Sequence, residues 1–140
     1  MTGTKRTEKG EKSEALILFS RLPIGSETKT RLSPLLDEGQ REALHRSFWA
    51  DAFAAALKLR DRADLFLYWT GSGRPEAYSA LIPAALELRE QRGRTLGDRM
   101  LAAAGDAFEA GYERAAIVGT DIPHMRPASI RRAFDLLAEA

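Results

Sequence analysis

The stretch LILFSRLPIGSETKTRL, residues 16–32, decides how this chain folds. Its first letters form a continuous apolar run, which is typical of a strand buried on both faces of a parallel sheet. The prolines and the glycine that follow predict a loop. This loop carries Arg21, Lys29 and Arg31 against one acid, Glu27. A buried strand that ends in a cationic loop is what an α/β protein needs to hold a phosphate group.

The composition is that of one modest globular domain. The chain has 140 residues, of which 44% are hydrophobic and 29% charged, enough for a single core. The absence of cysteine excludes disulfides and thiolate metal sites. A net charge of +1 argues against a nucleic-acid partner. No apolar run approaches the ~18 residues of a membrane span, and the polar N-terminus is unlike a secretory signal. We therefore expect a cytoplasmic protein without a membrane span.

The strands and the domain limits follow from local patterns. Residues 1–13 are small, polar and charged and are predicted to be disordered, whereas residues 14–140 are predicted to form a single α/β domain. Apolar runs predict further strands at 63–69 and 115–119, and a more charged segment at 86–91 is a third candidate. Each candidate strand is followed by a segment with a helical or turn pattern.

Helices are predicted over residues 38–60, 95–111 and from Pro127 onward, with a short one near 76–82. Thr95 and Gly111 serve as the expected caps of the second. The side chains predicted to be buried are Leu44, Phe48, Ala52, Ala55 and Leu59 in the first helix, with Trp49 and Phe53 widening that stripe, then Leu101, Ala104 and Phe108 in the second, and Ile130, Ala133, Phe134 and Leu137 in the last. Strands that alternate with helices predict a three-layer, Rossmann-like α/β sandwich with a mainly parallel sheet.

Ligands of such sheets bind outside the carboxyl ends of the strands. The cationic loop after the first strand, a second basic loop at 91–98, and Asp121 after the strand at 115–119 are expected to meet there. Arginine offers forked donors and lysine a point charge, which suit the phosphates of a small anionic ligand. Asp121 is either a ligand of Mg²⁺ or Mn²⁺ or a turn residue, and its local sequence favours neither.

Other motifs give no sharper assignment. The segment 25–30 lacks the glycine that a P-loop places directly before its lysine. The segment 71–73 lacks the third glycine of a dinucleotide fingerprint and is predicted to be a turn. No serine has the context of a nucleophile elbow. His45 lies beside the apolar stripe of the first helix and is expected to be structural.

Three sequence blocks carry a resemblance to a known family. They are Phe19-Ser20-Arg21-Leu22-Pro23 with Lys29-Thr30-Arg31-Leu32, then Gln91-x-Gly93-x-x-Leu96-Gly97-Asp98-Arg99-Met100, and then Val118-Gly119-Thr120-Asp121-Ile122-Pro123. In order and spacing these blocks resemble the bacterial GT-A-fold glycosyltransferase-like family called radical-SAM/selenodomain-associated transferase. That family is distantly similar to the guanylyltransferases that make molybdenum and deazaflavin cofactors. The resemblance covers about residues 14–140.

The resemblance implies the N-terminal half of a GT-A nucleotide-diphospho-sugar transferase fold. It implies that the protein binds a nucleotide or nucleotide sugar and, with Mg²⁺ or Mn²⁺, transfers a glycosyl or nucleotidyl group. The implied phosphate-binding residues are Arg21, Lys29, Thr30, Arg31, Gly97 and Arg99, and the implied metal ligand is Asp121.

Two departures from the family keep alternatives open. Gly25 stands one position before the place where the family has its loop glycine, here Ser26. Family members also run past the position of Ala140, where their acceptor half begins. The chain is therefore predicted to be a transferase, a catalytically incomplete nucleotide-binding module that lacks the acceptor half, or a purely structural domain. An exposed sheet edge would favour a homodimer.

Overall fold

The computed structural model describes residues 10, 12–122 and 125–140. The disorder predicted for residues 1–13 therefore falls largely outside the described residues, as does Pro123 of the third sequence block. No helix among the described residues combines the length and apolar character that a membrane span requires.

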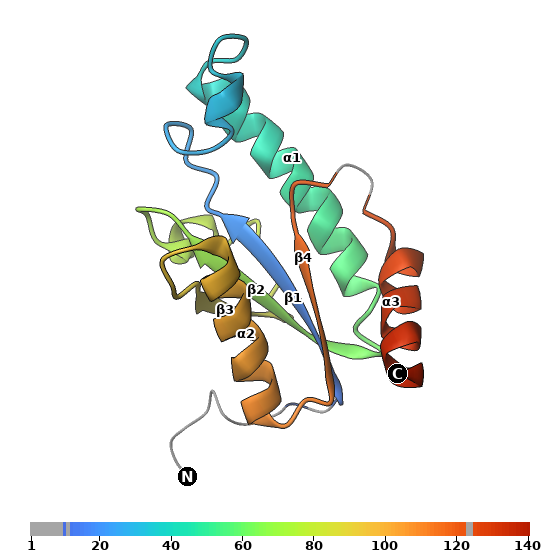
Figure 1. Cartoon of the computed structure of the whole chain (residues 1–140). Coiled ribbons are helices and arrows are strands. Elements are labelled where there is room, and N and C mark those ends of the chain that lie inside the picture. Colours follow the sequence, from blue (N-terminus) through green and yellow to red (C-terminus); the bar gives the residue numbers. More distant parts are fainter. Residues whose placement is uncertain (1–9, 11, 123–124) are drawn as a thin grey trace.

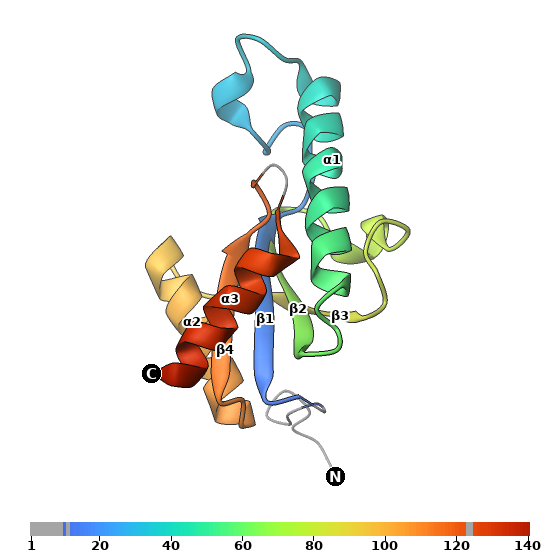
Figure 2. The same ribbon diagram turned by 90° about the vertical axis from the view of Figure 1, so that its right-hand side faces the viewer.

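Within the described residues, four parallel strands form one sheet in the order β3-β2-β1-β4. The strands are β1 (Glu14–Arg21), β2 (Ala63–Thr70), β3 (Leu86–Glu90) and β4 (Arg114–Gly119), the helices are α1 (Glu38–Leu57), α2 (Leu96–Ala110) and α3 (Pro127–Glu139), and two 3-10 helices span Thr30–Leu32 and Pro75–Tyr78. Helices α1 and α3 cover one face of the sheet and α2 covers the other (Figures 1 and 2). The predicted three-layer α/β sandwich is confirmed, including the weakly patterned strand β3.

The position of β1 in the centre of the sheet explains the apolar run at residues 15–19. It pairs with β2 on one side, Leu16 opposite Leu65, and with β4 on the other, Leu16 opposite Ala116. Because side chains alternate along a strand, Leu16 enters the core under α1 and α3 while Ile17 enters the core under α2. A strand covered on both faces needs apolar residues at every position.

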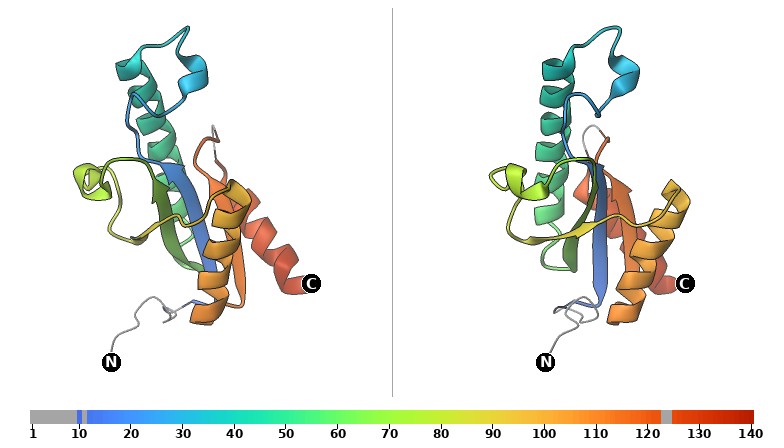
Figure 3. Two further views of the ribbon diagram at one scale, coloured as in Figure 1. Left: turned by 60° about the vertical axis from the view of Figure 1, so that its left-hand side comes forward. Right: turned by 90° about the vertical axis from the view of Figure 1, so that its left-hand side faces the viewer.

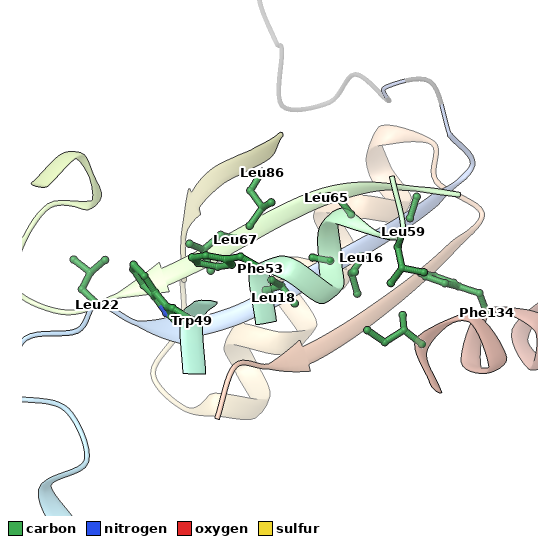
Figure 4. Close-up of a cluster of buried hydrophobic side chains, with 13 residues drawn as sticks. Leu16, Leu18, Leu22, Trp49, Phe53, Leu59, Leu65, Leu67, Leu86 and Phe134 are labelled. Atoms are coloured by element: carbon green, nitrogen blue, oxygen red, sulfur yellow. The ribbon is translucent and has the colours of Figure 1, made fainter. Parts of the chain in front are cut away.

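The core under α1 contains most of the large buried side chains (Figure 4). Trp49 and Phe53 of α1 pack there against Leu18 and Leu67 of the sheet. Trp49 and Phe53 are buried as predicted, as are Ala52, Ala55 and Leu59. The prediction is wrong at Leu44 and Phe48, which are only partly buried, whereas His45 beside them is buried. Alanines lie on every side of the second half of α1, so the apolar pattern fixes the rotation of this helix poorly.

The prediction for α2 is wrong at its two largest residues. Leu101 is 74% exposed and Phe108 is 55% exposed, whereas Ala103 and Ala107 are buried. The sheet face beneath α2 carries aromatic rings, Phe19 and Tyr68 stacked at 5.8 Å and Phe66 against Tyr112. Because these rings fill the space between the sheet and α2, the helix turns its small alanine side chains toward the sheet.

Helix α3 was predicted half correctly. Ile130 and Phe134 are buried as expected, whereas Ala133 and Leu137 are exposed. This terminal helix presents a narrower face to the sheet than its apolar pattern suggested, because it lies over the edge strand β4.

The predicted caps of α2 and the predicted start of α3 are confirmed, whereas α1 ends at Leu57, before the predicted residue 60, and the short helix predicted near 76–82 is the 3-10 helix Pro75–Tyr78. The Thr95 hydroxyl accepts a hydrogen bond from the Asp98 amide at the start of α2, and Gly111 ends the helix at φ 108°. Pro127 begins α3. The cap at Thr95 fixes where α2 starts, so that its first turn lies at the carboxyl edge of the sheet.

Candidate anion-binding pocket

A pocket of about 710 Å³ lies at the carboxyl ends of the strands. The loops that leave β1 and β4 lie at this end of the molecule (Figure 3). The sequence-predicted residues that line it are Arg21, Lys29, Thr30, Arg31, Arg99 and Asp121. Gly97, in the first turn of α2, is not among the lining residues. The three separate segments expected at this edge thus share one concave site of the size that small ligands occupy.

The positive charge of the pocket is largely uncompensated. Arg21, Arg31 and Arg94 line it, are exposed, and form no ion pair with any described residue. The two acids that line the pocket among the described residues have other hydrogen-bond partners: Glu27 accepts from the Ser72 amide and hydroxyl, which together with the nearby Arg21 charge lower the pKa of its carboxyl, and Asp121 accepts from Lys29. Guanidinium groups that gather without carboxylate partners favour the binding of an anion.

Lys29 differs from these arginines because it is held inside the pocket wall. Its Nζ atom donates to Oδ1 of Asp121 at 2.8 Å and lies 4.6 Å from the centre of the Phe48 ring. The Lys29 side chain is only 7% exposed, whereas that of Asp121 is 64% exposed. The partly buried position of Phe48 therefore serves the site, since its ring supports the lysine.

Asp121 is positioned by the pairing of β4 with β1. The Thr120 amide donates to the Phe19 carbonyl at 3.1 Å, which continues the ladder one residue past the end of β4. Thr120 is 2% exposed, so the chain turns outward only after it. This arrangement places the Asp121 carboxylate above the end of β1, beside the loop that carries Lys29.

The loop that follows β1 is shaped by a buried arginine of α1. The Arg41 guanidinium donates to the carbonyl oxygens of Gly25, Thr28 and Leu36, at 2.9, 3.2 and 2.8 Å. Lys29 then adopts a left-handed backbone, with φ 51° and ψ 40°, a conformation that costs a residue with a side chain about 1–2 kcal/mol. The bonds from Arg41 thus fix the backbone of the loop, and the left-handed turn at Lys29 directs its side chain toward Asp121.

Gly25 explains one departure from the family pattern. A Cβ atom at this position would lie 2.6 Å from the carbonyl oxygen of Glu38, which is part of the α1 backbone. The loop needs its glycine at position 25 because that is where it crosses the start of the helix. Ser26, one residue later, is exposed.

The second sequence block forms the opposite wall. The Arg99 side chain donates to the Gly93 carbonyl at 2.9 Å and to the Thr70 hydroxyl at 3.2 Å. Gly93 has φ 136°, and a Cβ atom there would lie 2.9 Å from the Cβ of Asp98. Gln91 donates to the Tyr68 carbonyl at 3.0 Å. The residues of this block therefore form a turn that is stabilised by hydrogen bonds, and the Arg99 side chain makes two of these bonds.

Sequence reasoning missed two features of the site. Arg94 lines the pocket, and although it lies in the predicted basic loop, nothing in its spacing set it apart from Arg92, which pairs with Asp106 instead. His45 is 2% exposed and also lines the pocket. Burial, together with the nearby Lys29 charge, lowers the pKa of His45 to about 4.

The donor set suits a metal ion only in part. Among residues 10, 12–122 and 125–140, no group of three His, Asp or Glu side chains is arranged to hold a metal. Asp121 nevertheless offers an exposed carboxylate, and Mg²⁺ in phosphate sites is commonly held by one or two carboxylates together with phosphates and water. These residues therefore fit a cation that arrives with a phosphate ligand, and they do not form a preformed metal centre.

Comparison with known proteins places the chain in a family. No curated protein matches its sequence. The crystal structure of a "putative nucleotide-diphospho-sugar transferase" from Desulfovibrio desulfuricans G20 is similar, with a TM-score of 0.81 and 27% sequence identity over 89% of this chain. The chain spans 54% of that protein's length. Residues 53–140 match the family described as "Uncharacterized protein conserved in bacteria (DUF2064)", and the chain therefore belongs to the DUF2064 family.

Proposed function

We propose that this domain binds the diphosphate part of a nucleotide or nucleotide sugar and acts in the transfer of a glycosyl or nucleotidyl group. One observation carries the proposal: three arginines without ion-pair partners among the described residues, together with Lys29, line one pocket at the carboxyl ends of parallel strands. The similarity to a protein described as a nucleotide-diphospho-sugar transferase supports the same substrate class.

The residues of the pocket have separate tasks in this proposal. Arg21 ends β1, Arg31 lies in the 3-10 helix that follows it, and Arg94 lies before α2, so they approach a diphosphate from two sides. Transfer of a sugar or nucleotidyl group leaves negative charge on a phosphate or diphosphate, and fixed cations stabilise that charge as it forms. Thr30 contributes a hydroxyl to the lining. Arg99 keeps the second wall in shape. The contribution predicted for Gly97 stays a prediction.

Asp121 would hold a divalent cation, Mg²⁺ or Mn²⁺, that accompanies the ligand. Such an ion supplies further positive charge for the leaving phosphate group. The Asp121 carboxylate is the exposed partner of the Lys29 pair and can be reached from the pocket. The cation remains a proposal, as do the homodimer and the cytoplasmic location expected from the sequence.

The binding experiment measures the shift in melting temperature with nucleoside diphosphates, nucleotide sugars and inorganic pyrophosphate, each with and without Mn²⁺. A ligand that binds only the folded state raises the melting temperature. We expect Arg31→Ala and Arg94→Ala each to weaken binding about tenfold, and the matched control Arg132→Ala, on the exposed side of α3, to bind as the wild type does. Equal affinities for all three variants would refute the proposed pocket.

Turnover separates the transferase from the alternative of an incomplete binding module. Release of nucleoside diphosphate from a nucleotide sugar supports glycosyl transfer, and release of pyrophosphate from a nucleoside triphosphate supports nucleotidyl transfer. Binding without release supports the module that lacks an acceptor half. The absence of any binding leaves only the structural role.

A further inference from the structure

A buried polar cluster lies directly beneath the cationic loop. Its members are His45 and Trp49 of α1, Ser20 of β1 and Thr28 of the loop, all at most 7% exposed. His45 Nε2 lies 3.1 Å from the Ser20 hydroxyl, and His45 Nδ1 lies 2.6 Å from the Thr28 hydroxyl. The cluster thus joins the central strand, the helix and the loop through one imidazole ring.

The protons of this cluster can be assigned by counting donors and acceptors. The Trp49 ring N–H can only donate, and it donates to the Ser20 oxygen at 2.7 Å. The single proton of the Ser20 hydroxyl points to the Arg21 carbonyl at 2.7 Å, which can only accept. The Ser20 oxygen therefore has one lone pair left for His45, and His45 Nε2 must be the donor.

The other ring nitrogen then has only one role. A neutral imidazole with its proton on Nε2 has a lone pair on Nδ1, so Nδ1 accepts and the Thr28 hydroxyl donates. The opposite tautomer would take the Ser20 proton away from the Arg21 carbonyl and would leave the Thr28 proton without this acceptor.

We propose that His45, as the Nε2–H tautomer, is a positioning residue that fixes Thr28 and thereby aims Lys29 into the anion pocket. Thr28 directly precedes Lys29, whose left-handed backbone directs its ammonium toward Asp121. An unfavoured backbone conformation persists only where its surroundings hold it. Three hydrogen bonds hold Thr28 beside Lys29: its hydroxyl contacts His45, its carbonyl accepts from Arg41, and its amide donates to the Ile24 carbonyl at 2.8 Å. The inference rests on the proposed function in so far as the pocket binds phosphate.

The first test reads the tautomer without any ligand. We expect ¹⁵N NMR of the full chain at neutral pH to show a protonated Nε2 and an unprotonated Nδ1 for His45. A proton on Nδ1 would overturn the inference, because Thr28 would then be an acceptor and the donor chain described above would not exist.

The second test compares two substitutions of His45 that each retain one of the two hydrogen bonds made by the imidazole. In His45→Asn the amide oxygen can still accept from Thr28, whereas in His45→Gln the longer amide can still donate to Ser20. Both leave a void and lower the melting temperature. We expect His45→Asn to bind inorganic pyrophosphate several-fold more tightly than His45→Gln, and equal affinities would overturn the inference.

The third test removes one hydroxyl. Thr28→Val is expected to weaken pyrophosphate binding several-fold and to speed amide exchange in residues 28–32. Its control is Tyr112→Phe, which removes a hydroxyl bonded to Asp64 at the opposite end of the sheet and should leave both readouts unchanged. Wild-type exchange in Thr28→Val would refute the positioning role. If the wild-type protein fails to bind pyrophosphate, the proposed function fails, while the tautomer and the exchange rates still decide the role of His45.

Discussion

The ammonium of Lys29 lies 2.8 Å from the carboxylate of Asp121, 92 positions later in the chain. The carboxylate predicted to hold a metal ion is therefore already neutralised by a cation of the protein itself. The lysine is buried and supported by Phe48, so its charge stays at this place. A divalent cation at Asp121 must compete with that charge unless a phosphate ligand draws the lysine away.

This competition predicts how metal binding responds to Lys29→Met. Without a nucleotide, we expect the variant to bind Mn²⁺ about fivefold more tightly than the wild type, since a partly exposed ion pair is worth about 1 kcal/mol. Pyrophosphate binding should weaken in the same variant. Titration of free Mn²⁺ by electron paramagnetic resonance measures the first effect. Lys58→Met, at the far end of α1, is the control, and an unchanged Mn²⁺ affinity in Lys29→Met would show that the pair does not compete.

Glycine substitutions test the fit of the loop on α1. Gly25→Ala would bring a methyl group to 2.6 Å from the Glu38 carbonyl oxygen, so we expect a loss of roughly 2 kcal/mol in the free energy of unfolding. Gly105→Ala, in the middle of α2, meets no atom within 4 Å and should stabilise the protein by about 0.5–1 kcal/mol. Urea unfolding measures both. A neutral Gly25→Ala would mean that the loop does not cross the helix so closely.

The buried His45 makes stability depend on pH. Because the pKa of His45 is lowered to about 4 in the folded state, the unfolded chain binds this proton first, below about pH 6.5. Stability should therefore fall by roughly 3 kcal/mol between pH 6.5 and pH 4 through this group. His45→Asn cannot take up the proton, so its stability should change less over the same range. Parallel curves for both proteins would contradict a neutral, buried imidazole.

Glu14 anchors the opposite end of the sheet through Arg62 and Arg114, at 2.6 and 2.7 Å. Burial raises the pKa of the Glu14 carboxyl, but hydrogen bonds from the two arginines outweigh it and lower the pKa overall. The stability that Glu14 contributes is thus present at neutral pH and is lost as the pH falls through its lowered pKa. Glu14→Gln should cost roughly 3 kcal/mol at pH 7.

The control for Glu14 is Glu113→Gln, because Glu113 also contacts Arg114 but is 67% exposed. Its loss should cost less than about 1 kcal/mol. Thermal unfolding at pH 7 and at pH 3 compares the two variants. If both cost the same at pH 7, burial of Glu14 does not strengthen its contacts.

The elements of the fold were predictable because strong local signals agreed with each other. The apolar run of β1, the cap at Thr95 and the glycine at 111 each specify structure within a few residues. The faces of the helices were harder to predict. Whether α2 turns Ala103 or Leu101 toward the sheet depends on the rings of Phe19 and Tyr68 beneath it, which arrive from distant parts of the sequence.

The site was predictable at the level of segments. Parallel strands end at one edge, so the meeting of Lys29 with Asp121 follows from topology. The Thr28–His45 contact does not follow, because it depends on which face of α1 turns inward. Likewise Arg94 and Arg92 differ only in whether a carboxylate, Asp106, happens to lie within reach. Pairing of that kind is set by three-dimensional distance.

The segments that line the pocket are far apart along the chain, since one follows β1, a second lies before and within the first turn of α2, and a third follows β4. A nascent or partly denatured polypeptide consequently has no complete site for a polyphosphate until β4 has joined the sheet. A metabolite that binds here would therefore stabilise only the fully folded domain, and would protect that domain from proteolysis.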